Sequence, residues 1–311
     1  MDIKKEVFGK LDAACKPGAI LATNTSTLDI NKIAAMTKRP ADVIGLHFFS
    51  PANIMRLLEI VRGEKTATDV LATSMKFART IAKMPVVVGV CDGFVGNRML
   101  AKYGAQAQRL IEEGALPWDV DRALTNFGLA MGPFAMGDLA GLDVGWRIRQ
   151  RRAKESSTGS AASITDAICE LGRFGQKTGK GWYKYEAGSR APIPDPEVEK
   201  IILDAREKHQ MRTRPISDEE IVKRCMYALV NEGAHILEEG IATRASDIDV
   251  IYLNGYGFPA WRGGPMFYAD LVGLKNVLAD IQGFEKADPK SWKTAPLLVK
   301  LVADGKGFFG K

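Results

Sequence analysis

The sequence predicts an α/β region followed by an all-α region, and three observations carry this prediction. Over residues 1–90, short apolar runs alternate with amphipathic stretches of helical period, which is typical of strands joined by helical crossovers in a mostly parallel sheet. Beyond residue 90 the apolar residues follow a helical period, without a further strand ladder. The chain also opens on a helix with no strand before it, so we expect the second half of a doubly wound domain.

The elements of the α/β region follow in chain order. The first is a helix over residues 4–14, which Pro17 and Gly18 separate from an apolar strand over residues 19–22. The same alternation then predicts a helix over 29–36, strands over 43–46 and 57–61, a helix over 66–83 and a strand over 86–88.

An internal repeat organises the all-α region. Amphipathic stretches over 95–113 and 117–127 open it, and several blocks coincide when Arg98 is aligned with Arg224. The paired blocks are 110–114 with 236–240, 119–121 with 247–249, 132–133 with 264–265, and 138–142 with 270–274. We interpret them as two copies of one helical unit packed face to face. The predicted domains are therefore 1–91, 92–190 and 191–311, with a polar loop over 151–160 and a proline-rich boundary over 192–196.

Composition limits the class of protein. Of the 311 residues, 46% are hydrophobic and 26% charged, the balance of a folded globular enzyme. No apolar run approaches the roughly 18 residues of a membrane-spanning helix, and residues 1–6 lack the apolar core of a secretory signal, so we expect an intracellular protein. The net charge of +6 comes from basic residues interleaved with acids, which argues against nucleic acid as a partner. The four cysteines lack CxxC spacing, so we expect neither disulfides nor a metal site.

His47 is the first candidate for catalysis. It stands at the carboxyl end of the predicted strand 43–46, the edge at which open parallel sheets bind ligands. Glu59, in the next strand, can orient the imidazole and stabilise its protonated form, and such a dyad suits proton abstraction. The alternative is a core histidine bonded to a backbone carbonyl.

Ser26 and Asn97 are further candidates. Ser26 follows the strand 19–22, so its hydroxyl opens toward the same edge as His47 and can bond a substrate oxygen. Alternatively, Ser26 or Thr27 caps the helix that starts near Asp29. Asn97 falls on the first turn of the helix after Gly96, where it can face a ligand or serve as a cap or helix-surface residue.

No segment of the sequence supplies a convincing phosphate-binding loop. Residues 305–310 spell GxGxxG, but the chain ends one residue later, whereas a dinucleotide loop must follow a strand and open a helix. Residues 175–183 have the composition of a phosphate loop but not the order GxxxxGK[ST], and no apolar strand leads into them. We therefore expect a packed turn there.

Taken together, these residues resemble the 3-hydroxyacyl-CoA dehydrogenase family, and specifically the dehydrogenase part of the multifunctional fatty-acid β-oxidation enzymes, which join it to an enoyl-CoA hydratase. The resemblance covers essentially the whole chain. The matching strings are NTSTL at 24–28, GLHFFSPA at 45–52, LE at 58–59, DGFVGNR at 92–98, GPF at 132–134, DLAGLD at 138–143, LGRFGQKTGKGWY at 171–183, YLNGYGFP at 252–259 and GGPMFY at 263–268. A duplicated helical domain is likewise a trait of the multifunctional members.

The resemblance implies a role for each candidate. His47 becomes the general base that removes the 3-hydroxyl proton of an acyl-CoA substrate while hydride passes to NAD, and Glu59 becomes its partner. Ser26 and Asn97 match positions that hold the substrate oxygen. Lys4, Ser50 and Ser26 match positions that touch the cofactor, and no metal is implied.

The resemblance also implies a partial Rossmann-type NAD-binding domain over residues 1–91. The glycine-rich loop of the family and the acid that reads the adenine ribose are expected upstream of Met1, together with a hydratase domain. We therefore expect a dehydrogenase fragment that is inactive alone; the alternative is a non-catalytic fragment or assembly module that retains the helical domain. The expected location is the bacterial cytoplasm, with the peroxisome as the alternative.

Overall fold

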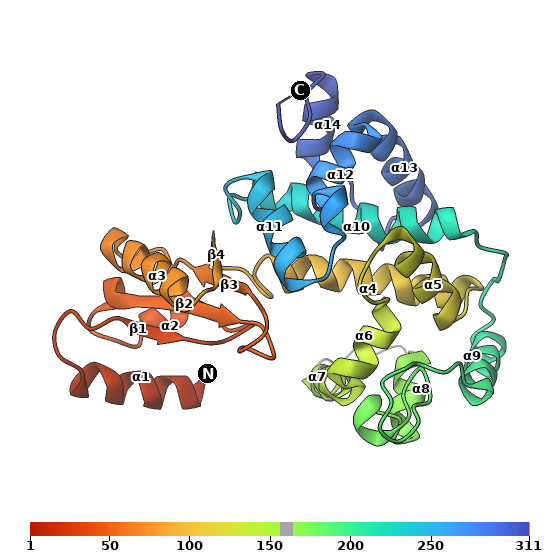
Figure 1. Cartoon of the computed structure of the whole chain (residues 1–311), viewed down its shortest axis with the longest axis horizontal. Coiled ribbons are helices and arrows are strands. Elements are labelled where there is room, and N and C mark those ends of the chain that lie inside the picture. The colour runs from red at the N-terminus through yellow and green to blue at the C-terminus, as the bar shows by residue number, and fades with distance from the viewer. Residues whose placement is uncertain (156–163, 311) are drawn as a thin grey trace. The chain divides into compact units, whose positions relative to one another are not determined.

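The computed structural model describes residues 1–155 and 164–310 (Figure 1). They form two compact units, one made of Met1–Tyr103 and Met226–Lys311 and the other of Gly104–Cys225. Two long helices, α4 (Gly96–Glu113) and α10 (Asp218–Glu238), each contribute one part to each unit. The predicted domain boundaries at 91 and 190 stay a prediction.

The first unit contains a sheet of four strands in the order β1-β2-β3-β4, namely β1 (Leu21–Thr23), β2 (Val43–Phe48), β3 (Leu57–Val61) and β4 (Met84–Val88). The pairs β1/β2 and β3/β4 are parallel, as the mostly parallel sheet requires. The pair β2/β3 is antiparallel. The reason is the connection over residues 49–56, which contains no helix to carry the chain back across the sheet.

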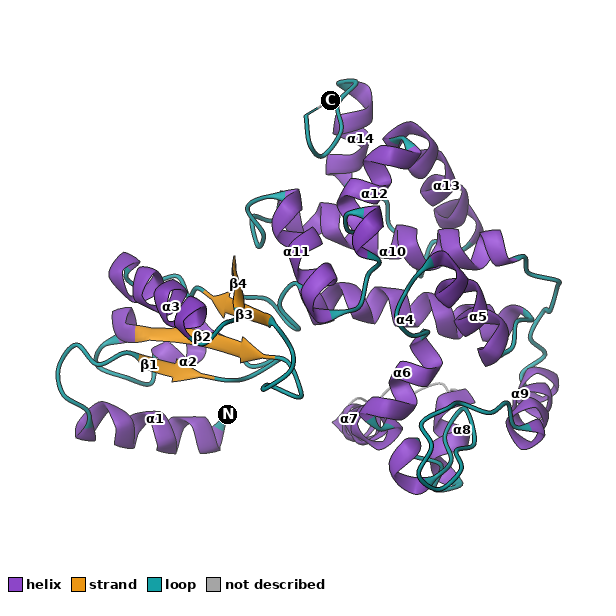
Figure 2. Cartoon of the chain, viewed as in Figure 1, coloured by secondary structure: helices purple, strands orange, loops and turns teal. Residues whose placement is uncertain are grey.

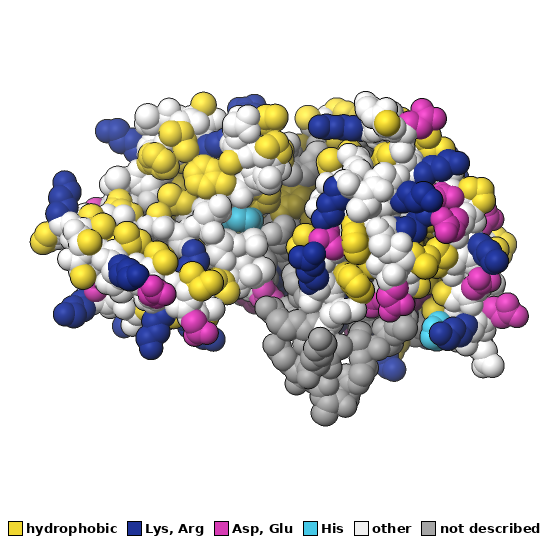
Figure 3. Space-filling view, turned by 90° about the horizontal axis from the view of Figure 1, so that it is seen from below, with side chains coloured by type: hydrophobic (Ala, Val, Ile, Leu, Met, Phe, Trp, Pro, Cys, Tyr) yellow, Lys and Arg dark blue, Asp and Glu magenta, His cyan; other side chains and the backbone are white. Residues whose placement is uncertain are grey.

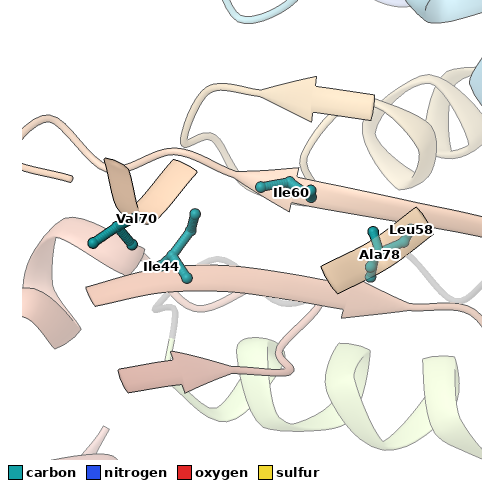
Figure 4. Close-up of a cluster of buried hydrophobic side chains, with 5 residues drawn as sticks. All are labelled: Ile44, Leu58, Ile60, Val70 and Ala78. Carbon is teal, nitrogen blue, oxygen red and sulfur yellow. The ribbon is translucent and has the colours of Figure 1, made fainter. Parts of the chain in front are cut away.

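Both faces of this sheet are covered (Figure 2). Helix α3 (Thr68–Thr80) covers one face, where Val70 and Ala78 pack on Ile44, Leu58 and Ile60 (Figure 4). Helices α2 (Ile30–Ala34) and α11 (Ala245–Gly255) contact the strands too. They lie on the opposite face, because a Cβ on Gly45 of β2 would meet Ile30 and one on Gly255 would meet Leu57 of β3. Helix α1 (Asp2–Ala14) contacts β1 and α2.

The other helices follow the predicted pattern, with one correction. They are α5 (Pro117–Phe127), α6 (Pro133–Ala140), α7 (Leu142–Glu155), α8 (Ile164–Glu170), α9 (Pro196–Lys208), α12 (Pro265–Val272), α13 (Leu274–Ala287) and α14 (Pro296–Ala303). The loop predicted over 151–160 is wrong up to Glu155, because α7 continues to that residue. Arginine, alanine, lysine and glutamate form helices well, so a polar composition did not exclude one. Residues 156–160 lie outside the described residues.

The internal repeat has a counterpart in the contacts of four aspartates, of which Asp121, Asp138 and Asp249 are buried and Asp270 is half-buried. In the second unit, Asp121 accepts from the backbone N–H groups that open α6, and Asp138 accepts from those of Trp182 and Tyr183. In the first unit, Asp249 accepts in the same way from the start of α12, and Asp270 accepts from Phe308 and Phe309. The GxGxxG string at 305–310 is therefore the second copy of a packed turn, as its position after a helix indicates.

The arginines that anchor the alignment also play equivalent parts. Arg98 of α4 binds Glu232 of α10 at 2.6 Å and Glu239, in the turn directly after α10, at 2.5 Å. Arg224 of α10 binds Gln106 and Glu113, both on α4. Each copy thus supplies the cation in one unit and its polar partners in the other, which is the arrangement that two face-to-face copies produce.

No helix in the described part of the chain is long and apolar enough to cross a membrane. Among the described residues there is also no group of three or more histidine, cysteine and acidic side chains that could hold a metal. All four cysteines are free. Acidic and basic side chains are interspersed on the face that Figure 3 shows.

Candidate active site

His47 and Glu59 form the centre of the candidate site. They are direct partners in the antiparallel register of β2 and β3, so their side chains project from the same face of the sheet. Nδ1 of His47 lies 2.7 Å from Oε2 of Glu59. Glu59 is 0% exposed and His47 6% exposed. A carboxylate buried this fully needs hydrogen-bond donors, and the imidazole is one of them.

The second donor to Glu59 is the start of helix α4. The backbone N–H of Gly96 donates to Oε1 of Glu59 at 2.9 Å. Both carboxylate oxygens are therefore held, and the positive end of a helix faces the negative charge. With Nδ1–H donating to Glu59, the lone pair of His47 lies on Nε2, which has no hydrogen bond within the described residues.

Aromatic rings set the position of the imidazole. The rings of Phe49 and Phe94 lie 4.5 Å and 5.5 Å from that of His47, centroid to centroid. Phe94 is fully buried and adopts a positive φ of 50°, which is uncommon for a residue other than glycine. The position of the imidazole is thus set by its partner carboxylate and by two aromatic rings.

Asn97 lies one residue beyond Gly96 and is held by a tyrosine from α11's carboxyl end. The hydroxyl of Tyr256 donates to Oδ1 of Asn97 at 2.8 Å. Burial raises the pKa of Tyr256 well above its usual value, so this hydroxyl stays protonated. Because Oδ1 is engaged, the Nδ2 group of Asn97 remains as a donor for a ligand.

Tyr256 and its neighbour Tyr252 are site residues that sequence reasoning missed. The two rings stack at 4.8 Å, Tyr256 meets Phe49 edge to face, and Tyr252 donates to the carbonyl of Gly96 at 3.2 Å. The string at 252–259 matched the resemblance, but nothing in the sequence indicates that α11 returns to the sheet. The second copy of the repeat therefore helps to build the site.

Ser26 lies in the loop between β1 and α2, where it is half-buried. The cap of α2 is Asp29, whose carboxylate accepts from the N–H groups of Asn31 and Lys32, so the alternative role of Ser26 or Thr27 as that cap is wrong. The loop is joined to the end of β2 by a hydrogen bond from Phe48 N–H to Asn24 Oδ1 at 3.2 Å. Ser26 thus belongs to the edge of the sheet that carries His47.

Lys4 and Ser50 are the other predicted cofactor residues. Lys4 is half-buried on α1, and Ser50 is exposed in the connection after β2, before a cis bond to Pro51. No contact joins either side chain to His47 or Glu59 in the part of the chain that the structure describes. Their predicted roles therefore remain untested by the geometry.

The described residues fit the reactive end of a dinucleotide better than its phosphates. A pyrophosphate binds to free N–H groups where a strand leads into a helix through glycines. Of the described strand-to-helix loops, the one after β1 has no glycine, and Gly63 after β3 donates to Thr66. After β4, Gly89 donates to Ile241 and Gly96 to Glu59, so among the glycines of these loops Gly93 alone has a free N–H, too few for a pyrophosphate. The nicotinamide end, by contrast, has a base and an amide donor available at one edge of the sheet.

This chain is similar over nearly its whole length to curated proteins of known class. It is 48% identical to a peroxisomal bifunctional enzyme from Cavia porcellus, and the match covers 98% of this chain and 44% of that protein. It is 38% identical to a peroxisomal fatty acid beta-oxidation multifunctional protein from Arabidopsis thaliana, covering 98% of this chain and 43% of that protein. The chain thus spans less than half the length of these relatives.

Solved structures give the same result. The dehydrogenase part of multifunctional enzyme 1 from C. elegans matches with a TM-score of 0.69 and 36% identity, covering 96% of this chain and 68% of that one. The fold is also that of 3-hydroxybutyryl-CoA dehydrogenase from Escherichia coli, with a TM-score of 0.80 at 23% identity over 98% of this chain and 80% of that one.

Two family models match successive parts of the chain. Residues 1–91 match the NAD binding domain of 3-hydroxyacyl-CoA dehydrogenase, and residues 93–185 and 221–307 match its C-terminal domain. The fold class predicted from the sequence is therefore confirmed. The chain belongs to the 3-hydroxyacyl-CoA dehydrogenase family, a family of NAD-dependent oxidoreductases.

Proposed function

We propose that this chain oxidises (S)-3-hydroxyacyl-CoA to 3-ketoacyl-CoA with NAD, as a step of fatty-acid β-oxidation. The observation that carries the proposal is the hydrogen-bonded series from Gly96 through Glu59 to His47, which leaves Nε2 as a proton acceptor. NAD, when bound, accepts the hydride from C3 of the substrate.

The residues of the chain account for the proton. Nε2 of His47 removes the proton from the 3-hydroxyl while the C3–H bond breaks and the C3–O double bond forms. The positive charge that results on the imidazole is stabilised by the Glu59 carboxylate, which Gly96 N–H keeps in place. Nδ2 of Asn97 donates to the substrate oxygen, and Ser26 provides a second hydroxyl contact to it. Lys4, Ser26 and Ser50 are proposed to touch the nicotinamide half of the cofactor.

The lengths and names of the relatives support a longer protein with a further domain. Because the chain spans less than half of proteins named bifunctional or multifunctional, we propose that it is joined to an enoyl-CoA hydratase domain. Such a domain makes the 3-hydroxyacyl-CoA that this site consumes. The peroxisomal relatives favour the peroxisome over the bacterial cytoplasm as the location.

Turnover of a short-chain (S)-3-hydroxyacyl-CoA, followed by NADH absorbance, tests the proposal. It is measured on this chain and on the chain joined to the sequence that precedes it in its gene. We expect His47→Gln to lower turnover by about two to four orders of magnitude, the usual contribution of a general base. The matched control is His235→Gln, which changes a histidine of α10 instead.

Two results would contradict the proposal. Equal turnover by the wild type and His47→Gln, in a form of the chain whose wild type is active, would remove His47 as the base. Absence of turnover from both the chain and its longer form would favour the non-catalytic assembly module.

A further inference from the structure

A pocket of about 600 Å³ lies in the first unit among α12, the start of α13 and the turn after α14, which are neighbours in Figure 1. We call it the α13 pocket. Its apolar wall includes Leu271 and Phe309, which are 66% and 43% exposed. Lys275 and Lys306 also line it and are exposed. The α13 pocket shares no residue with the dehydrogenase site, so a role for it is independent of the proposed function.

The repeat shows what fills the equivalent place in the first copy. Helix α8 ends at Gly172 in the left-handed conformation, with Arg173 N–H bonded to Ile168 O. Helix α14 ends in the same way at Gly305, with Lys306 N–H bonded to Leu301 O. From there the second copy proceeds directly to the turn that binds Asp270. The first copy inserts residues 174–180 before the turn that binds Asp138.

The inserted segment covers the start of α7. The carbonyl of Phe174 accepts from Leu142 N–H, and the ring of Phe174 lies 5.9 Å from that of Trp146. Lys177 forms an ion pair with Asp143. The equivalents of Leu142 and Asp143 in the second copy are Leu274 and Lys275, and both line the α13 pocket. The equivalent position in the second copy therefore carries a positive charge, that of Lys275, where the first copy has the negative charge of Asp143.

Lys306, like Lys275, favours an occupant of the α13 pocket that is negatively charged. Its equivalent in the first copy is Arg173, which is met by Asp195 at 2.7 Å and Glu197 at 2.6 Å. These carboxylates belong to the chain that follows the inserted segment. The acid within the pocket itself, Asp270, already accepts two backbone N–H groups. Thus both cationic positions call for carboxylates from outside the second copy.

We propose that the α13 pocket docks an acidic turn of a partner polypeptide. A backbone carbonyl of the docked turn accepts a hydrogen bond from Leu274 N–H. This N–H is one of the donors that the first turn of a helix leaves without an intrahelical partner. Its carboxylates meet Lys275 and Lys306, and one apolar side chain lies against Leu271 and Phe309. A polypeptide is favoured over a small carboxylate because polypeptide fills the equivalent place in the first copy.

Two synthetic peptides test this docking site. The probe is the capped peptide Phe-Gly-Gln-Glu-Thr-Gly-Glu, the sequence of residues 174–180 with both lysines replaced by glutamate. Its control is the unchanged Phe-Gly-Gln-Lys-Thr-Gly-Lys. Binding to the full chain is followed by NMR through the backbone amides of Leu274 and Lys275. We expect the acidic peptide to bind about tenfold more tightly, since two partly exposed ion pairs replace two repulsions.

Charge reversal in the chain makes the test specific. Lys275→Glu is expected to weaken binding of the acidic peptide and to strengthen binding of the basic peptide. Lys286→Glu, on the same helix but outside the pocket, is expected to change neither. Equal affinity of the two peptides, or an acidic peptide that is indifferent to Lys275→Glu, overturns the proposal. So does a result in which octanoate shifts these amides and the acidic peptide does not, since the pocket then takes small carboxylates.

Discussion

At the scale of single residues, Glu59 serves two donors at once. Its Oε2 faces His47 and its Oε1 accepts from Gly96, so a glutamine at this position has one oxygen for two N–H groups. We expect Glu59→Gln to lower the free energy of unfolding by about 1–3 kcal/mol, the cost of a buried donor left unsatisfied. Turnover should fall less than in His47→Gln, because the imidazole remains.

Urea unfolding and turnover of the Glu59→Gln variant check both parts. Glu64→Gln, at an exposed position just beyond β3, is the matched control. A variant with unchanged stability would show that the two hydrogen bonds do not hold the carboxylate in solution.

We infer that Tyr256 positions Asn97 through the hydrogen bond to its Oδ1. Tyr256→Phe removes the hydrogen bond to Oδ1, so the amide is free to turn and present its oxygen to the substrate. We expect kcat/KM to fall by about threefold to tenfold, equivalent to one hydrogen bond of about 1 kcal/mol. The contrasting variant is Tyr252→Phe, which loses its bond to the Gly96 carbonyl and leaves Asn97 held.

A similar loss in Tyr252→Phe would mean that the tyrosines act by packing alone. An unchanged kcat/KM in Tyr256→Phe would remove Tyr256 as a positioning residue.

The sequence could predict the pair His47 and Glu59 but not the tyrosine. Both members of the pair belong to strands that follow one another in the chain, and a short connection brings such strands together. The contact between Asn97 and Tyr256 joins positions far apart in the sequence. It depends on the whole course of the chain between them, which local patterns do not contain.

At the scale of elements, the start of α4 packs against the end of α11 too closely for a side chain at Gly96. A Cβ there would lie 2.4 Å from the hydroxyl oxygen of Tyr256. We expect Gly96→Ala to displace the tyrosine, to lower the free energy of unfolding by about 1–3 kcal/mol as overpacking does, and to lower turnover.

Gly104→Ala is the matched control on the same helix, because its Cβ would have no atom within 4 Å. Alanine in a helix interior is favoured over glycine, so this variant should gain about 0.5–1 kcal/mol. Thermal unfolding of the two variants measures the contrast. If both respond alike, the close approach to Tyr256 has no energetic consequence.

Element prediction succeeded where side-chain patterning and length agree. The strand over residues 57–61 and the helix over 117–127 coincide with β3 and α5, because runs of buried residues and a proline start mark them clearly. The extension of α7 to Glu155 escaped prediction, since polar helix formers give no periodic signal. The antiparallel pairing of β3 with β2 was not predicted either, because a run of apolar residues does not show in which direction its strand runs in the sheet.

At the scale of the whole molecule, the repeat places one buried aspartate at the same point of each unit. Burial raises the pKa of Asp121 to about 6 and that of Asp249 to about 7. The hydrogen bonds that these carboxyl groups accept from backbone N–H groups lower both pKa values, but burial has the larger effect. Neither aspartate is a candidate for catalysis. Their common effect is on the dependence of folding stability on pH.

The direction of this effect follows from the raised values. A carboxyl group whose pKa is higher in the folded than in the unfolded chain contributes stability that is fully present below the unfolded value, near 3.8, and is lost as pH rises through the folded value. Stability should therefore fall between about pH 4 and pH 7. Each of the two groups contributes at most about 1.4 kcal/mol per pH unit within its own interval.

Asparagine variants isolate the contribution of each aspartate. In Asp249→Asn the side chain cannot ionise, so the loss of stability between pH 5 and 7 should be smaller than in the wild type by about 1.4 kcal/mol per unit at most. Asparagine also removes one acceptor from Met266 or Phe267, but that cost is the same at both pH values and cancels in the difference.

Asp121→Asn should likewise reduce the loss of stability with rising pH, but over a lower pH interval that ends near pH 6. Urea unfolding at several pH values measures these slopes, with the exposed Asp304→Asn as the control. Should Asp249→Asn keep the slope of the wild type, the carboxyl of Asp249 is already ionised throughout this range, and its two backbone hydrogen bonds outweigh its burial.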